Sequence, residues 1–182
     1  MEWNNRKRNE WNLPLKTSPK KRFYLLVGIC MIVMLVIFFF SHMPYKEQDI
    51  KPFLRDKIDL SNVPFPSLTF EYDGQVISTD TDPYSFIEFL FRKAGHVAGY
   101  CLLTLFLFFT VMQTKLKGGW GYIVSGALAI LYALSDEWHQ SFVPGRTGHW
   151  QDAIIIDGIG VVLGLMIGYI VRVRRDKKGR YH

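Results

Sequence analysis

The fold of this chain is decided first by residues 23–40, which read FYLLVGICMIVMLVIFFF. The run carries no charge, and as a helix rising 1.5 Å per residue it would extend about 27 Å. That length matches the roughly 30 Å hydrocarbon core of a bilayer. Because backbone groups in lipid must bond within their own segment, the run is predicted to be a membrane-spanning helix. No small-residue cleavage site follows it, so we interpret it as a retained helix and not as a signal peptide.

Three further apolar runs follow along the 182-residue chain. They contain His96 and Asp157 as their only residues of the Asp, Glu, Lys, Arg or His types. We therefore expect an all-α membrane protein with four transmembrane helices. The expected segments are a basic tail (1–22), the first span (23–40), an outer loop (41–93), a core of three spans (94–114, 118–135 and 153–171, together 94–171) and a second basic tail (172–182).

Lysine and arginine are distributed unevenly over these segments. Of the 22 basic residues, 15 fall in residues 1–22, 115–117 and 172–182, which four crossings place on one side of the membrane. Because positively charged loops remain in the cytoplasm, both termini are expected to be cytoplasmic. The net charge of +6 lies mostly in the two tails. Tails of this kind set topology and contact anionic lipid, so no nucleic-acid partner is predicted.

The outer loop is expected to contain small elements of its own. Alternating apolar residues on both sides of Asp73-Gly74 predict a β-hairpin between residues 68 and 78. Residues 46–60 are predicted to form a short amphipathic helix. Asp82 followed by Pro83 predicts a helix start, since aspartate caps the first turn and proline fits its first position. Residues 83–93 are expected to lie at the membrane interface before the chain turns into the second span.

The segment between the last two apolar runs is the most polar, and residues 135–157 read SDEWHQSFVPGRTGHWQDAIIID. Ionisable groups at or inside a bilayer are costly, so a chain that keeps this many is expected to use some of them. Helical spacing places Lys93, His96 and Tyr100 on one face of the second span, at its outer end. Asp136 and His139 end a similar stripe on the third span.

The fourth span carries Asp157 on the same face as a seam of glycines, Gly160, Gly164 and Gly168. Small residues let helices pack closely, so Asp157 is expected to face protein. The seam is consistent either with a homodimer or with packing inside one chain. The three polar stripes end at one level, which predicts a shared cluster lined by three helices.

Two sets of candidate residues follow from this arrangement. Arg146 is the sharpest binding candidate, because a guanidinium binds phosphate or carboxylate through two parallel hydrogen bonds. It could equally pair with Asp136, Glu137 or Asp152. Lys93 could instead extend to the interface, and Asp157 could be a structural acceptor. The binding candidates are Lys93, Tyr100, Gln140, Arg146, Asp152 and Asp157; the acid–base candidates are His96, His139, Asp136 and Glu137.

A metal or other cofactor is not expected. Histidines and carboxylates near residues 136–152 would supply enough nitrogen and oxygen ligands. However, the chain has no HExxH motif, and the spacing of DEWHQ (136–140) matches no zinc signature.

Three segments resemble the VanZ-like family of bacterial membrane proteins. They are RKAGHVAGYCLL (92–103), SDEWHQSFVPGRTGHWQD (135–152) and IIDGIGVVLG (155–164). The resemblance covers about residues 40–170. The chain departs from it at Gly99, where members often have glutamate, and at Asp157, where many have asparagine. The matching positions are Lys93, His96, Tyr100, Asp136, Glu137, His139, Gln140, Phe142, Pro144, Gly145, Arg146, Asp152, Asp157 and Gly160.

The resemblance implies a protein of the bacterial cell membrane, and the member that gives the family its name is associated with resistance to teicoplanin. Two hypotheses are carried forward. The first is a membrane module that binds a lipid, a lipid-linked precursor or a lipophilic glycopeptide at an outward-facing polar pocket. The second is a membrane-embedded hydrolase or transferase acting on a lipid-linked envelope precursor. The expected partners are therefore membrane lipids or such a precursor.

Overall fold

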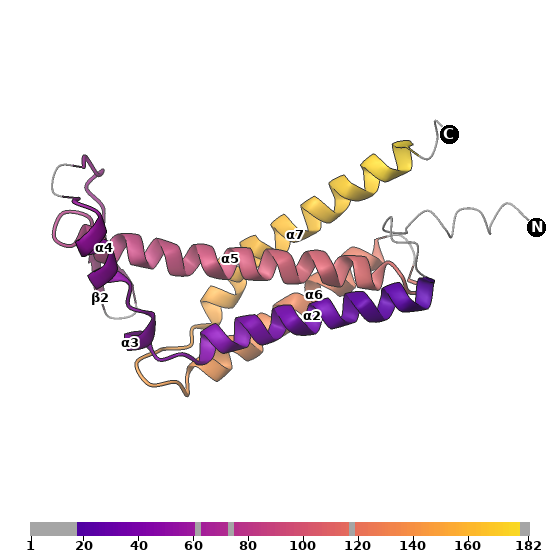
Figure 1. Ribbon diagram of the computed structural model, residues 1–182, viewed down its shortest axis with the longest axis horizontal. Helices are drawn as coiled ribbons and strands as arrows, with labels where there is room; N and C mark the ends of the chain where they lie inside the picture. Colours follow the sequence, from indigo (N-terminus) through magenta and orange to yellow (C-terminus); the bar gives the residue numbers. More distant parts are fainter. Residues whose placement is uncertain (1–17, 61–62, 73–74, 117–118, 179–182) are drawn as a thin grey trace, which may run out of the picture.

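Four long helices make up most of the computed structural model, which describes residues 18–60, 63–72, 75–116 and 119–178. Helix α5 contacts each of the other three. In Figure 1, α7 crosses α5 obliquely, and the first turn of α2 lies at the same end of the bundle as the last turn of α7. The four helices are α2 (Pro19–His42), α5 (Pro83–Val111), α6 (Trp120–Gln140) and α7 (Trp150–Lys178).

The helix starts follow the expected capping rules. The Ser18 hydroxyl accepts a hydrogen bond from the backbone N–H of Lys21 at 3.4 Å, and Pro19 occupies the first turn of α2. At α5, the Asp82 carboxylate accepts from the backbone N–H of Ser85 at 3.3 Å, which confirms the predicted start.

The predicted turn between residues 83–93 and the second span is wrong. No proline follows Pro83 within α5, so its hydrogen-bonded ladder continues for 29 residues.

The elements between α2 and α5 lie at the opposite end of the bundle from the first turn of α2 (Figure 1). Two short helices, α3 (Tyr45–Gln48) and α4 (Lys51–Lys57), replace the single helix predicted over residues 46–60. Pro52 explains the break, because it has no N–H and its ring conflicts with the carbonyl four residues earlier. Strands β1 (Thr69–Tyr72) and β2 (Gln75–Ser78) form the predicted antiparallel pair; its turn, residues 73–74, lies outside the described residues.

Within the described residues, α2, α5 and α7 are long and apolar enough to cross a membrane. Helix α6 is not among them. It continues five residues past the predicted end of its apolar run, and its last two turns include Asp136, Glu137 and His139. A fourth crossing by α6 and the cytoplasmic position of both termini remain predictions. Most of the two basic tails, residues 1–17 and 179–182, lies outside the described residues.

The glycine seam of α7 packs against α5 of the same chain. A Cβ atom added at Gly160 would lie 2.5 Å from the carbonyl oxygen of Val97, and one added at Gly164 would lie 2.5 Å from that of Cys101. Only glycine allows the two backbones to approach this closely. The seam therefore serves packing inside one chain, which was one of its two interpretations. A homodimer remains a prediction. The contact brings one face of α7 against the face of α5 that carries His96.

Candidate functional site

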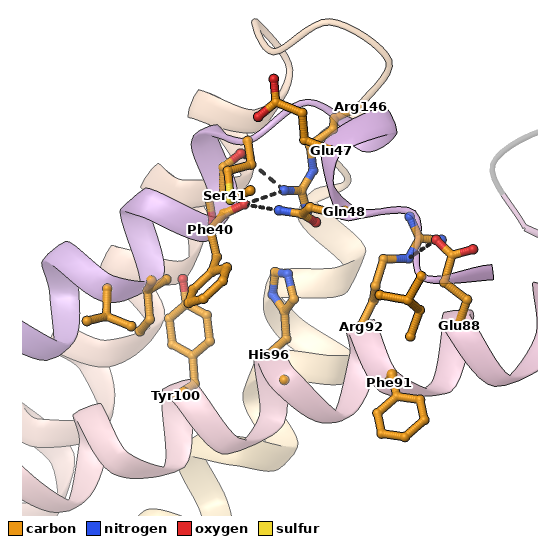
Figure 2. A pocket seen from close by; sticks show the side chains of 16 residues that line it. Phe40, Ser41, Glu47, Gln48, Glu88, Phe91, Arg92, His96, Tyr100 and Arg146 are labelled. Atoms are coloured by element: carbon orange, nitrogen blue, oxygen red, sulfur yellow. Dashed lines mark hydrogen bonds and ion pairs between the residues drawn. The ribbon is translucent and has the colours of Figure 1, made fainter. Parts of the chain in front are cut away.

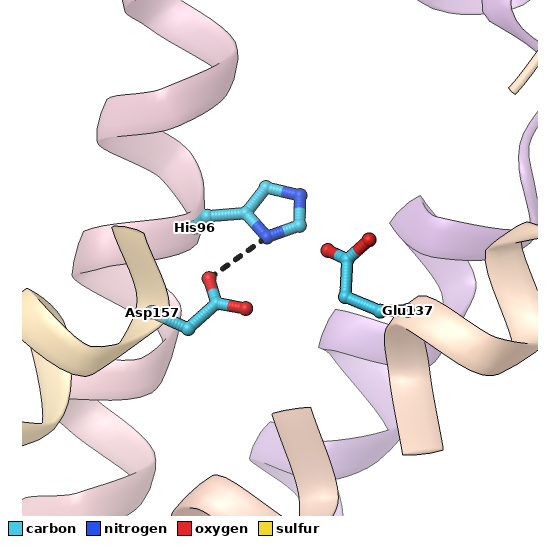
Figure 3. Close-up of side chains that lie close together, drawn as sticks. All are labelled: His96, Glu137 and Asp157. Atoms are coloured by element: carbon cyan, nitrogen blue, oxygen red, sulfur yellow. Dashed lines mark hydrogen bonds and ion pairs between the residues drawn. The ribbon is translucent and has the colours of Figure 1, made fainter. Parts of the chain in front are cut away.

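Three ionisable side chains from three helices converge at the outer-loop end of the bundle. His96 of α5 and Asp157 of α7 share a hydrogen bond of 3.1 Å between Nδ1 and Oδ1. Glu137 of α6 faces them, and one ligand-type atom of each residue lies within 4.8 Å of the others (Figure 3). Asp157 is fully buried, and its second oxygen, Oδ2, has no hydrogen-bond partner. Neutral surroundings do not compensate a buried carboxylate, so this cluster requires a positive partner.

The loop between α6 and α7 holds Glu137 in place. Gly145 adopts a φ of 74°, which glycine tolerates without strain, and it turns the chain back toward α6. A Cβ atom at Gly148 would lie 1.9 Å from the carbonyl oxygen of Glu137, so the loop can pass there only as glycine. The next residue, His149, donates its backbone N–H to Glu137 Oε2 at 2.9 Å. The two glycines therefore orient the carboxylate from which the cluster is built.

A second polar group ties α5, α7 and the hairpin together. Lys93 of α5 donates to Asp152 of α7 at 2.6 Å, and both side chains are mostly buried. Tyr72 of β1 hydrogen-bonds to both of them. Lys93 is therefore an ion-pair partner within the protein, and the alternative that it extends freely to the interface does not apply to this arrangement.

Asp136 and Gln140 face α2, one turn apart on α6. Asp136 Oδ2 accepts hydrogen bonds from the Ser41 hydroxyl at 2.7 Å and from the Gln140 amide at 3.0 Å. Its other oxygen, Oδ1, is buried and without a partner. Asp136 thus joins the end of α2 to α6. It does not hydrogen-bond to His96, the acid–base candidate on α5.

Arg146 is held by backbone carbonyls and not by Asp136, Glu137 or Asp152, which were the alternative partners. Its guanidinium donates to the carbonyl oxygens of Phe40 and Ser41, at 2.9 and 3.2 Å, at the end of α2. Burial lowers the pKa of the Arg146 guanidinium, and the nearby charge of Arg92 adds to this, whereas Asp136 and Glu137 oppose it. An arginine in a protein nevertheless stays charged. Among the described residues its guanidinium forms no salt bridge, so its charge is available to an anionic ligand.

His139 lies away from the cluster. It follows Glu137 by two residues, which is about 200° around a helix. Its ring contacts Phe38 and His42 of α2, with 3.2 Å between His139 Nε2 and His42 Nδ1. Tyr100, by contrast, is fully buried and stacks on the His96 ring at 6.4 Å, and its hydroxyl has no hydrogen-bond partner.

A cavity of about 530 Å³ lies beside the cluster, between α2, α3 and α5. Its walls are mainly apolar, with Ile37 and Phe40 on α2 facing Phe91, Gly95 and Gly99 on α5. Figure 2 shows His96 and Tyr100 pointing into it from α5, with Arg146 and Gln48 across the space, both bonded to the Phe40 carbonyl. Its polar lining residues include Glu47 and Glu88 as well as Arg92, His96 and Arg146.

A smaller hollow of about 80 Å³ adjoins this cavity and is mostly polar. Three residues, Arg92, His96 and Arg146, line both spaces. Lys93, Glu137, Gln140 and Asp152 line only the small hollow. Six of the ten candidate residues therefore line the small hollow. The apolar cavity and the polar hollow meet at Arg92, His96 and Arg146, and we call this meeting point the junction.

Several residues of the site were not among the sequence candidates. Arg92 and Glu88 lie on α5 next to the candidate face, and Arg92 also lies over the ring of Tyr45 at 4.8 Å. Buried Glu88 is 3.6 Å from Lys51 of α4 and 4.0 Å from Arg92. Their signal was weak, because a charged residue in the first three turns of an amphipathic helix is ordinarily assigned to the solvent face. Only the docking of α3 and α4 encloses them.

Helices suited to a membrane, with charged side chains from several of them gathered around one junction, define a helical membrane protein with a polar site. The VanZ/LLP1 family model matches residues 26–172, so the chain belongs to that family, and the resemblance noted from the sequence is confirmed. No curated protein and no solved structure matches the chain.

Proposed function

We propose that this VanZ-family membrane protein binds an anionic amphiphile of the cell envelope: a lipid, a lipid-linked precursor or a lipophilic glycopeptide. The observation that carries the proposal is a mainly apolar cavity whose lining includes the guanidinium groups of Arg92 and Arg146. An acyl or prenyl chain fits the apolar part. A phosphate or carboxylate head group fits the arginine end, because guanidinium groups bind both through paired hydrogen bonds.

The size of the cavity and its place in the bundle support this assignment. Its volume of about 530 Å³ falls in the roughly 300–1,000 Å³ range of ligand sites. It opens between two helices that are long and apolar enough to cross a membrane, α2 and α5. We further propose that α6 is the fourth crossing and that both termini are cytoplasmic, as the basic tails predict. The cavity then faces the outer leaflet, where envelope precursors and glycopeptides are met.

Filling the apolar part tests the proposal without touching a charge. Gly95 lines the cavity, and a Cβ atom added there meets no atom within 4 Å. Gly95→Leu should therefore leave the fold intact, with a small gain of about 0.5–1 kcal/mol in helix stability, while its side chain displaces the ligand's chain. Binding of a fluorescent phosphatidylglycerol to the purified protein in detergent measures this, and we expect it to be lost.

Gly28→Leu is the matched control for that experiment. Gly28 is also an exposed helical glycine with no atom within 4 Å of an added Cβ, but it lies on α2 outside the cavity. Its variant should bind the lipid as the wild type does. Equal binding by Gly95→Leu and wild-type protein would show that the apolar cavity is not the ligand site.

Removing the positive charge tests the other end of the site. Arg146→Ala should weaken phosphatidylglycerol binding by about ten- to a hundredfold, since a charged hydrogen bond contributes about 1.5–3 kcal/mol. Arg146→Lys should recover part of the affinity at low salt. Arg55→Ala removes an equal charge outside the cavity and should have no effect.

The Arg146 experiment needs a neutral lipid for comparison. The same label on a zwitterionic phosphatidylcholine should bind more weakly than phosphatidylglycerol, and Arg146→Ala should narrow that difference. An unchanged preference for the anionic lipid in Arg146→Ala protein of normal thermal stability would exclude the proposed role of this guanidinium.

We propose that ligand binding contributes to teicoplanin-type resistance, as the family association suggests. Expression of the wild-type chain in a susceptible bacterium should raise the minimum inhibitory concentration of teicoplanin. Gly95→Leu protein, present at equal abundance in the membrane, should return it to the level of cells with an empty vector. His139→Gln is the control, since His139 faces α2 and not the cavity. If cells with Gly95→Leu protein were as resistant to teicoplanin as cells with the wild-type chain, resistance would not depend on the cavity.

A second candidate function, hydrolysis or transfer on a lipid-linked envelope precursor, is favoured by the His96–Asp157 hydrogen bond at the junction of the two hollows. His96 would accept the proton of an attacking water or alcohol while Arg146 holds the phosphoryl group, and the bond to the leaving group would break. Purified protein incubated with a fluorescent lipid-linked precursor should then release product, and His96→Gln should abolish it. Tight binding of the precursor without product would exclude catalysis and leave binding as the one proposed function.

A further inference from the structure

We propose that His96, Glu137 and Asp157 bind one divalent transition-metal ion. The three side chains come from α5, α6 and α7, and their ligand-type atoms lie within 4.8 Å of one another (Figure 3). Imidazole nitrogen and carboxylate oxygen both ligate such ions, and a site with three protein ligands leaves a further coordination position open for water or a ligand. The inference concerns the ion alone and does not depend on amphiphile binding.

The unsatisfied oxygen of Asp157 is the independent observation that points to a ligand. Asp157 has no exposed surface, and its Oδ2 has no hydrogen-bond partner although Oδ1 bonds to His96. Glu137 accepts the backbone N–H of His149 through Oε2 and faces the His96–Asp157 pair. A cation held by the three side chains would satisfy the buried Asp157 Oδ2.

Charge balance leads to the same conclusion. Two carboxylates face a single imidazole, and the Lys93 ammonium in the adjoining hollow is already bound to Asp152. A protonated His96 neutralises one negative charge at most, whereas a divalent ion neutralises both and leaves His96 neutral. The hydrogen bond that Glu137 Oε2 accepts from the His149 backbone N–H is of the kind that outer partners make in metal sites, and His96 and Asp157 are already in contact.

Some closure of the site is required. Bonds of about 2.0–2.1 Å place tetrahedral ligand atoms about 3.4 Å apart, less than the present limit of 4.8 Å. Rotation of the Glu137 side chain would provide the closure, because Glu137 approaches from α6 on the side opposite His96 and Asp157 (Figure 3). The ion would then lie next to the junction lined by Arg92 and Arg146, where the head group of the proposed ligand would meet it.

The test is metal binding by the full chain in detergent, without a histidine tag, after treatment with EDTA and desalting. Zn²⁺ and Mn²⁺ are titrated separately by isothermal calorimetry, and Co²⁺ is followed by its visible absorption, which reports the coordination geometry. We expect one ion per chain. Asp157→Asn and Glu137→Gln should each weaken binding at least about tenfold, and both should lower the Co²⁺ absorption.

Two control variants make the result specific. Asp56→Asn removes an exposed carboxylate of α4 that pairs with Lys57 outside the cluster, and should leave metal affinity unchanged. His139→Gln removes the other close histidine pair, His42 and His139, and should also leave it unchanged. Should Asp157→Asn fail to fold, His96→Gln takes its place in the comparison.

The outcomes are separable. No binding by the wild-type chain, or binding lost only with His139→Gln, would overturn the proposal and leave His96 and Asp157 as a proton-sharing pair. Because these titrations contain no lipid, their failure says nothing about amphiphile binding, and a failure of lipid binding says nothing about the ion.

Discussion

Adding a single methyl group at Gly164 should destabilise the protein by about 1–3 kcal/mol, as over-packing of a tight interface does. Its Cβ would lie 2.5 Å from the Cys101 carbonyl oxygen and 2.9 Å from the Thr104 Cβ, so the backbone of α5 itself must yield. Gly160→Ala should behave alike because it meets the Val97 carbonyl at the same distance. Thermal unfolding of the purified protein in detergent measures the change.

Gly158→Ala on the same helix is the control and should have the opposite sign. Its added Cβ meets nothing closer than 4.0 Å. Replacing a helical glycine by alanine should then stabilise the protein by about 0.5–1 kcal/mol. If Gly164→Ala were as stable as Gly158→Ala, α7 would not pack on α5 as described. A displaced α7 would also carry Asp157 away from His96, so metal and lipid binding should fall in Gly164→Ala.

Breaking the Lys93–Asp152 ion pair should have a still larger effect. The two groups are 2.6 Å apart, with side chains only 19% and 16% exposed. Lys93→Met leaves a mostly buried carboxylate without its cation, and removing one member of a buried pair costs about 3–5 kcal/mol. The expected result is a marked fall in the unfolding temperature, together with release of the hairpin that Tyr72 ties to this pair.

A double variant distinguishes the pair from its members. Lys93→Met combined with Asp152→Leu removes both charges and should regain most of the lost stability, because no isolated charge stays buried. Lys57→Met breaks a pair of similar length, 2.8 Å to Asp56, whose side chains are more than half exposed. It should cost less than about 1 kcal/mol. Equal losses for Lys93→Met and Lys57→Met would mean that burial does not govern the Lys93 pair.

The elements that the sequence predicted correctly are those that depend on local rules. The apolar runs became α2, α5 and α7, the Asp82-Pro83 cap begins α5, and the residues around positions 73–74 pair as strands. Each of these rests on periodicity, hydrophobicity or the chemistry of one or two residues. The two errors concern where a helix ends. The single helix predicted over residues 46–60 is interrupted at residues 49–50, and α5 continues through residue 93, where a turn was predicted.

For the candidate site too, local rules predicted which face of a helix carries a side chain but not which partner the side chain binds. Helical spacing alone placed Lys93, His96 and Tyr100 on one face of α5, and the glycine seam predicted that Asp157 faces protein. The partner of each group was not predictable: Asp157 bonds to His96, Asp152 to Lys93, and Asp136 to Ser41. His139 was assigned to the cluster by helical spacing, as the end of the polar stripe on the third span, but in the structure that part of α6 faces α2.

The sequence by itself determined that this chain forms apolar helices suited to a membrane, which of their faces are polar, and to which family it belongs. It did so because helical period and hydrophobic length are properties of a segment alone. Only the tertiary structure decided that an apolar cavity lies beside the cluster, that Arg146 closes on the end of α2, and that His96, Glu137 and Asp157 meet. Those depend on how helices distant in sequence cross, which is set by backbone approach at Gly160 and Gly164 and by the docking of α3 against α5.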